Sequence, residues 1–150
     1  MAGVRLYFGS DHAAIELRDH LATRAREAGH EVVATLGPAE PTEKADYPDV
    51  AVQVSERVRD DAGAFGVLVC GTGQGMAITA NRVAGIRAVV CSETFSAAMG
   101  RAHNDANVLC VGARVVGLGL ATSIFDAFLA TAFEGGRHLR RVDKITALDA

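Results

Sequence analysis

Short apolar runs alternate with stretches of helical periodicity along most of this 150-residue chain. Runs typical of strands cover residues 4–8, 31–36, 65–70, 86–91 and 108–111. Between them, apolar residues recur every three or four positions, as they do in helices with one buried face. Strands separated by helices pair in parallel through right-handed crossovers. The sequence therefore predicts one domain over residues 1–150, a three-layer α/β/α Rossmann-like fold with a five-stranded parallel sheet.

The last strand precedes a long apolar segment, which predicts a helix over residues 118–133. Apolar residues on several of its faces predict burial nearly all round. A chain this small rarely hides so much apolar surface alone, so we expect a dimer interface here. The C-terminal helices, about residues 117–148, are expected to contribute to it.

Composition narrows the possible functions. The net charge of −3 argues against a general nucleic-acid binder, and no apolar run approaches the length of a membrane span. The N-terminal residues do not form a signal peptide. The three cysteines form no Cys-x-x-Cys pair, which fits reduced thiols in a cytoplasmic protein better than a disulfide or zinc framework. No histidine, cysteine or carboxylate cluster has the spacing of metal ligands, so no metal is expected.

The third strand ends at Cys70 and is followed at once by a glycine-rich turn, residues 71–75. Glycines allow sharp turning and close approach to a ligand, and a helix that starts after such a turn attracts anions. The same positive terminus stabilises a thiolate, so Cys70 is a candidate base or nucleophile. Alternatively, Cys70 is a small buried residue and the turn serves packing. The turn matches neither the dinucleotide fingerprint nor the P-loop.

Three other places carry candidate chemistry. Asp11 and His12 follow the first strand, although Asp11 could be a helix N-cap and His12 a surface residue. His103 ends the fourth helix, where it could be an acid–base group or a partner of the helix dipole. Arg137 and Arg141 are four residues apart, so a helix would place both on one face, either to bind a phosphate or as a solvated basic surface.

Seven motifs, in this order, resemble those of the ribose-5-phosphate isomerase B family, which also includes galactose-6-phosphate isomerase subunits. The motifs lie at residues 9–12, 46–48, 70–75, 80–88, 101–109, 112–117 and 134–142. The resemblance covers nearly the whole chain. It implies interconversion of aldose and ketose phosphates without a metal or organic cofactor, in dimers or tetramers whose sites use both subunits.

The resemblance also implies residue roles. Cys70 would move the proton between C1 and C2, and His103 would open the furanose ring. In some members a glutamate replaces the cysteine as base, but the corresponding position here is Met76, which cannot act as one. Thr72 and the turn amides would stabilise the enediolate. The other implied substrate contacts are Asp11 and Asn104 to hydroxyls, His12, Arg114, Arg137 and Arg141 to the phosphate, and Tyr47, Gly71, Gly73 and Gly75.

Ribose 5-phosphate is the expected substrate, with allose 6-phosphate, galactose 6-phosphate and tetrose phosphates as alternatives. Two other functions stay open: a nucleotide-binding module of the same fold, and an enzyme that uses Cys70 with His103 as a thiol nucleophile. A partner-dependent subunit is a further possibility within the family. Such a subunit is disfavoured because both Cys70 and His103 are present.

Overall fold

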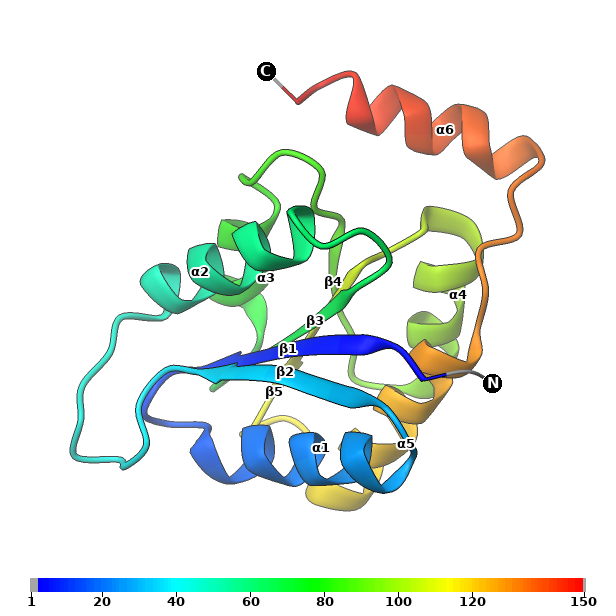
Figure 1. Ribbon diagram of the computed structural model, residues 1–150. Coiled ribbons are helices and arrows are strands. Elements are labelled where there is room, and N and C mark those ends of the chain that lie inside the picture. Colours follow the sequence, from blue (N-terminus) through cyan, green and yellow to red (C-terminus); the bar gives the residue numbers. More distant parts are fainter. Residues whose placement is uncertain (1–2, 150) are drawn as a thin grey trace.

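The computed structural model describes residues 3–149 as alternating strands and helices that end in two consecutive helices (Figure 1). The elements are β1 (Arg5–Ser10), α1 (Ile15–Glu27), β2 (Glu31–Leu36), α2 (Tyr47–Arg59), β3 (Phe65–Cys70), α3 (Gln74–Ala80), β4 (Ala88–Val90), α4 (Thr94–Asn104), β5 (Val108–Gly112), α5 (Leu118–Ala130) and α6 (Arg137–Thr146).

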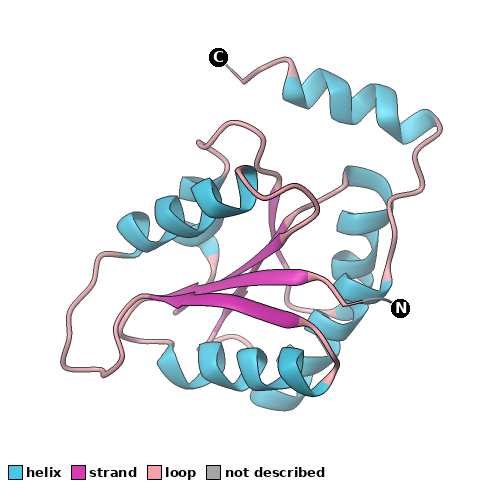
Figure 2. Cartoon of the chain, viewed as in Figure 1, coloured by secondary structure: helices cyan, strands magenta, loops and turns pink. Residues whose placement is uncertain are grey.

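The five strands form one parallel sheet in the order β2-β1-β3-β5-β4. One face packs against α1, α4 and α5, and the other packs against α2 and α3 (Figure 2). The predicted three-layer fold and its parallel sheet are confirmed. Because every strand runs the same way, all strand carboxyl ends lie along one edge, where ligands bind in such sheets.

Alternation along β3 distributes its side chains between two cores. Val67 and Val69 belong to the core under α1 and α5, whereas Leu68 and Cys70 belong to the core under α2 and α3. Successive strand residues point to opposite faces, so this division follows from the strand geometry. Cys70 therefore reaches the carboxyl edge on the side of α3, directly beside the glycine-rich turn.

The long helix α5 differs from its prediction. It ends at Ala130, and the next residue, Thr131, already has extended backbone angles. The expected burial nearly all round is wrong, because Leu118 and Leu120 are 40% and 44% exposed. The buried residues form one stripe with the spacing of a single helix face: Ala121, Ile124, Phe125, Phe128 and Leu129.

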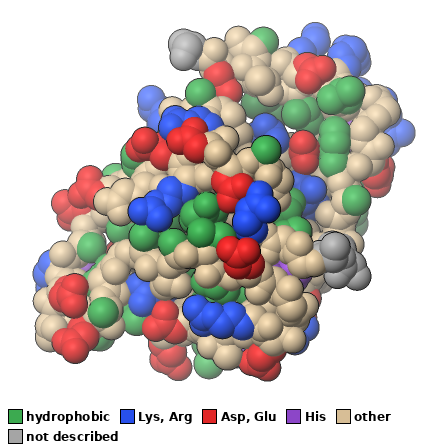
Figure 3. Space-filling view, viewed as in Figure 1, with side chains coloured by type: hydrophobic (Ala, Val, Ile, Leu, Met, Phe, Trp, Pro, Cys, Tyr) green, Lys and Arg blue, Asp and Glu red, His purple; other side chains and the backbone are tan. Residues whose placement is uncertain are grey.

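The last helix, α6, stands apart from the three layers (Figure 1). The chain reaches it through Gly135 and Gly136, which have φ angles of 66° and 55°. Its C-terminal end is held near the α3–β4 connection, where the Gly85 amide donates to Asp149 Oδ2 at 2.8 Å. Hydrophobic atoms reach the surface along this helix and just beyond it (Figure 3), from Leu139 and Ile145 in the helix and from Leu148 after its end. Among residues 3–149, no helix has both the length and the apolar character needed to cross a bilayer.

Candidate active site

The turn after β3 holds the thiol of Cys70 against backbone amides. The Gly73 amide donates to Cys70 Sγ at 3.1 Å, and the Gln74 amide donates to Thr72 Oγ1 at 3.3 Å. Gly73 has a φ of 82°, in the left-handed region that glycine adopts without steric cost. An N–H aimed at sulfur stabilises negative charge there. The turn thus combines a nearly buried thiol and a hydroxyl with backbone amides that donate to both.

The neighbouring strand β5 fixes this turn from the side. The Ala113 amide donates to the Cys70 carbonyl at 2.8 Å, and the Arg114 amide donates to the Gly71 carbonyl at 3.0 Å. Arg114 itself is exposed. The backbone therefore brings an arginine from the end of β5 next to the loop that carries the thiol.

Residues after β1 and at the start of α2 complete this edge. Asp11 Oδ1 accepts from the Ala13 amide at 3.0 Å, while the N-cap of α1 is Ala14, so the N-cap role considered for Asp11 is wrong. His12 Nδ1 accepts from the Ala45 amide at 3.4 Å. Tyr47 lies over Gly75, where an added Cβ would be 2.3 Å from the tyrosine ring. We call these residues the strand-end group: Asp11, His12, Tyr47, Cys70, Thr72 and Arg114.

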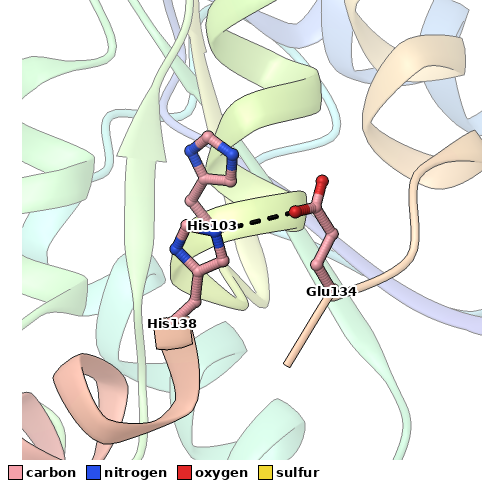
Figure 4. A group of neighbouring side chains, drawn as sticks. All are labelled: His103, Glu134 and His138. Carbon is pink, nitrogen blue, oxygen red and sulfur yellow. Dashed lines mark ion pairs between the residues drawn. The ribbon is translucent and has the colours of Figure 1, made fainter. Parts of the chain in front are cut away.

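A second set of predicted residues gathers where α4 ends and α6 begins. The ring of His103 stacks on that of His138, with centroids 4.2 Å apart and planes 11° from parallel (Figure 4). Asn104 is the last residue of α4 and is exposed. Arg137 and Arg141 lie in the same helix, α6, as predicted, and both are exposed. We call the helix-end group His103, Asn104, Arg137, His138 and Arg141.

The fold separates the two groups within one chain. Helix α4 follows a strand and runs back along the sheet, so its end lies near the amino ends of the strands. The Gly66 amide at the start of β3 donates to Asn107, just beyond α4, whereas Cys70 pairs with Gly112 at the far end of β5. Four residues of parallel strand, about 13 Å, separate these two levels. Cys70 and His103 of one chain therefore do not face a common substrate, which weighs against a thiol–histidine pair within one subunit.

Burial distinguishes the three thiols. Burial raises the pKa of Cys91 to about 11 and raises the pKa of Cys110 still further. Both thiols therefore stay protonated and inert near neutral pH. Among the described residues, Cys70 is the only cysteine whose sulfur lies beside the glycine-rich turn.

Two side chains near His103 received no role from the sequence. The fold brings Glu134 and His138 to this histidine, and His138 Nε2 lies 3.6 Å from Glu134 Oε1. Burial, then the nearby His103 and Arg137, lower the pKa of His138. Glu134 and His138 are four residues apart in the sequence, and this spacing could have indicated that the two side chains form a pair. It could not have indicated His103, which lies on α4 more than thirty residues earlier and is brought to them only by the fold.

A doubly wound α/β protein with a thiol beside a glycine-rich turn, and with arginines near a histidine, has the groups for proton transfer on an anionic substrate. A family profile described as Ribose/Galactose Isomerase matches residues 6–145. The chain is 47% identical to the ribose-5-phosphate isomerase B of Escherichia coli, covering 97% of this chain and 96% of that one. It is 42% identical to a D-erythrulose-4-phosphate isomerase of Pectobacterium atrosepticum, covering 91% and 90%.

The structure of ribose-5-phosphate isomerase B from Clostridium thermocellum superposes with a TM-score of 0.92 at 43% identity, over 97% of each chain. The protein belongs to the ribose/galactose isomerase family, and the resemblance drawn from the motifs is confirmed. It is an enzyme of the sugar isomerase class.

Proposed function

We propose that this enzyme interconverts ribose 5-phosphate and ribulose 5-phosphate through an enediolate, with Cys70 as the base. The observation that carries the proposal is the Cys70 sulfur, held 3.1 Å from the Gly73 amide inside a turn that can receive an anion. The relatives named for ribose 5-phosphate support the choice of substrate. Three buried free thiols fit a reducing cytoplasm.

The proposed chemistry moves one proton between adjacent carbons. The Cys70 thiolate takes the proton from C2 of the open-chain aldose and returns it to C1, while the hydroxyl proton passes between O1 and O2. Negative charge develops on oxygen in the enediolate, and Thr72 with the amides of residues 71–75 would stabilise it. Asp11 and Tyr47 would position the sugar, since both lie at the same edge.

We propose that each site is shared between two subunits of a homodimer, or of a tetramer built from such dimers. The thiol would meet His103 of the partner subunit, which opens the ring, and Asn104 of the partner subunit, which binds a hydroxyl. Support comes from the opposite placement of the two groups within one chain. The C-terminal helices, from about residue 117 to 148, would contribute to the interface, because α6 exposes Leu139 and Ile145 and the chain just after it exposes Leu148.

The substrate phosphate would bind between cations of both subunits. His12 and Arg114 belong to the strand-end group, and Arg137 and Arg141 would come from the partner subunit. Neither Arg137 nor Arg141 forms an ion pair within residues 3–149. Guanidinium groups bind phosphate oxygens through paired N–H donors. Binding energy from the phosphate would hold C1 and C2 at the base.

A tetrose phosphate is the second candidate substrate. The relative from Pectobacterium atrosepticum, named for erythrulose 4-phosphate, is 42% identical over most of both chains. The two candidates differ by one carbon between the reacting end and the phosphate. Initial rates on four-, five- and six-carbon aldose and ketose phosphates, without added metal, would rank them by kcat/KM. A preference for a four- or six-carbon sugar would overturn the assignment to ribose 5-phosphate.

The base is tested by Cys70→Ala, with Cys91→Ala as a matched control at another buried thiol. Loss of a positioned base should lower kcat by roughly 10²–10⁴-fold while substrate still binds. The control should keep its activity. Near-normal turnover by Cys70→Ala would refute the role of the thiol.

Ring opening is tested separately with His103→Ala. This variant should lose more activity on ribose 5-phosphate than on ribulose 5-phosphate, which cannot close a furanose through a free C5 hydroxyl. An equal loss on both sugars and on an acyclic aldose analogue would argue against this role.

A further inference from the structure

Three side chains of metal-ligand type converge where α4 meets the start of α6. They are His103, Glu134 and His138, and one potential ligand atom from each lies within 4.8 Å of the others (Figure 4). His138 Nε2 is 3.6 Å from Glu134 Oε1, and the two imidazole rings lie face to face. Glu134 is exposed and His103 is half-buried, whereas His138 is buried with 9% of its surface exposed, so an ion from solvent would approach from the side of Glu134 and His103.

Backbone hydrogen bonds hold Glu134 and His138 near His103. The Glu134 amide donates to the Ala102 carbonyl at 3.0 Å, which fixes the glutamate beside the last turn of α4. Gly135 and Gly136 then reverse the chain through two positive φ angles. The His138 amide donates to the Gly135 carbonyl at 3.0 Å, which closes the turn and returns the imidazole over His103.

The donor set suits a borderline transition metal. Two imidazole nitrogens and one carboxylate oxygen, with a position left for water, form a common zinc set, whereas Mg²⁺ and Ca²⁺ prefer oxygen ligands. Ligands about 2.1 Å from a tetrahedral zinc ion are about 3.4 Å apart. The separations here, within 4.8 Å, need closing by at most about 1.4 Å. The rings must also turn out of their stack, because each lone pair lies in its ring plane.

The charges around the three side chains differ in sign. Arg137 and Arg141 act on His138 as nearby positive charges and oppose a divalent cation, whereas Glu134 offsets part of that repulsion. The carboxylate is therefore the ligand on which cation binding should depend most.

We propose that His103, Glu134 and His138 form an inhibitory zinc site. Zn²⁺ bound here would engage the imidazole of His103, so that this ring could neither give nor take the proton needed to open the sugar. The inhibitory consequence rests on the proposed function, whereas the binding of zinc does not.

Binding is tested on the full chain without reference to activity. Protein stripped with a chelator is dialysed against Zn²⁺ and its metal content is measured, and Co²⁺ is added in parallel to record the visible absorption of a low-symmetry site. We expect about one ion per chain. Glu134→Gln should weaken binding at least about tenfold, whereas Glu27→Gln, another exposed carboxylate, should not. Cys70→Ala should bind zinc as the unsubstituted protein does.

Activity supplies the second readout. Zn²⁺ should lower turnover of ribose 5-phosphate at least about tenfold, EDTA should restore it, and Glu134→Gln should resist the metal while keeping its basal rate. Equal zinc affinity in Glu134→Gln and in the unsubstituted protein, or loss of binding in Cys70→Ala, would overturn the site. Zinc binding at the three residues without inhibition would overturn the inhibitory role. If Cys70 is not the base, only the turnover of Cys70→Ala without metal would show it. The proposal of Cys70 as base and the proposal of the zinc site can therefore be refuted independently.

Discussion

Mixing two inactive variants should restore activity if the site is shared between subunits. The perturbation combines Cys70→Ala chains with His103→Ala chains. Within one subunit the two positions lie on opposite edges of the sheet, about 13 Å apart along the strands, too far to act on neighbouring atoms of one sugar. If each site takes Cys70 from one chain and His103 from the other, a mixed dimer has one site with both substitutions and one with neither.

The expected recovery follows from the symmetry. Random exchange of equal amounts gives mixed dimers as half of the population, and each has one intact site of two, so turnover should reach about one quarter of the unsubstituted value. The Cys70→Ala homodimers should retain at most about 1%. The assay is turnover of ribose 5-phosphate after mild denaturation and refolding of the mixture, with exchange verified by native mass spectrometry. Verified exchange without recovery above the parent variants would refute the shared site.

The remaining predictions concern the turn, the phosphate, acid and chelators. Gly112→Ala places a Cβ 2.6 Å from the Thr72 backbone, so it should lower the free energy of unfolding by about 1–3 kcal/mol and reduce kcat. The control is Gly119→Ala, where a Cβ would have no atom within 4 Å and the free energy of unfolding should change by no more than about 1 kcal/mol. Arg137→Ala should mainly raise KM, with a loss of about ten- to a hundredfold in kcat/KM, because a phosphate contact that persists through the reaction gives uniform binding; an unchanged KM would contradict the contact. Burial and then Arg24 lower the pKa of His30 below 6.5, so the unfolded chain takes up a proton first, and thermal stability should fall as the pH drops below that value. His30→Gln should flatten this dependence, as melting temperatures between about pH 7.5 and 5.5 would show. EDTA should leave the activity of purified enzyme intact, and a divalent ion that restored activity lost to EDTA would contradict the metal-free mechanism.

The sequence alone determined the architecture. Strand and helix periodicities depend on neighbours a few residues apart, so the five parallel strands and the helix that carries Arg137 and Arg141 were predictable. The turn after Cys70 was also predictable, because glycine spacing and a strand end are local features. Local pattern failed at α5, where apolar residues outside the buried stripe stay partly exposed. Composition shows that a helix is apolar but not which of its faces meets the core.

Only the tertiary structure decided which functional residues meet. The motifs implied a site that uses Cys70, His103 and both subunits, without saying which subunit supplies which residue. The direction of α4 puts Cys70 and His103 of one chain at opposite edges of the sheet, because a helix between parallel strands must return the chain to the starting edge. That constraint separates the strand-end and helix-end groups and underlies the proposal of a shared site. The convergence of His103 with Glu134 and His138 depends on a glycine turn and on contacts distant in sequence. The spacing of these three residues along the chain therefore does not predict that they meet.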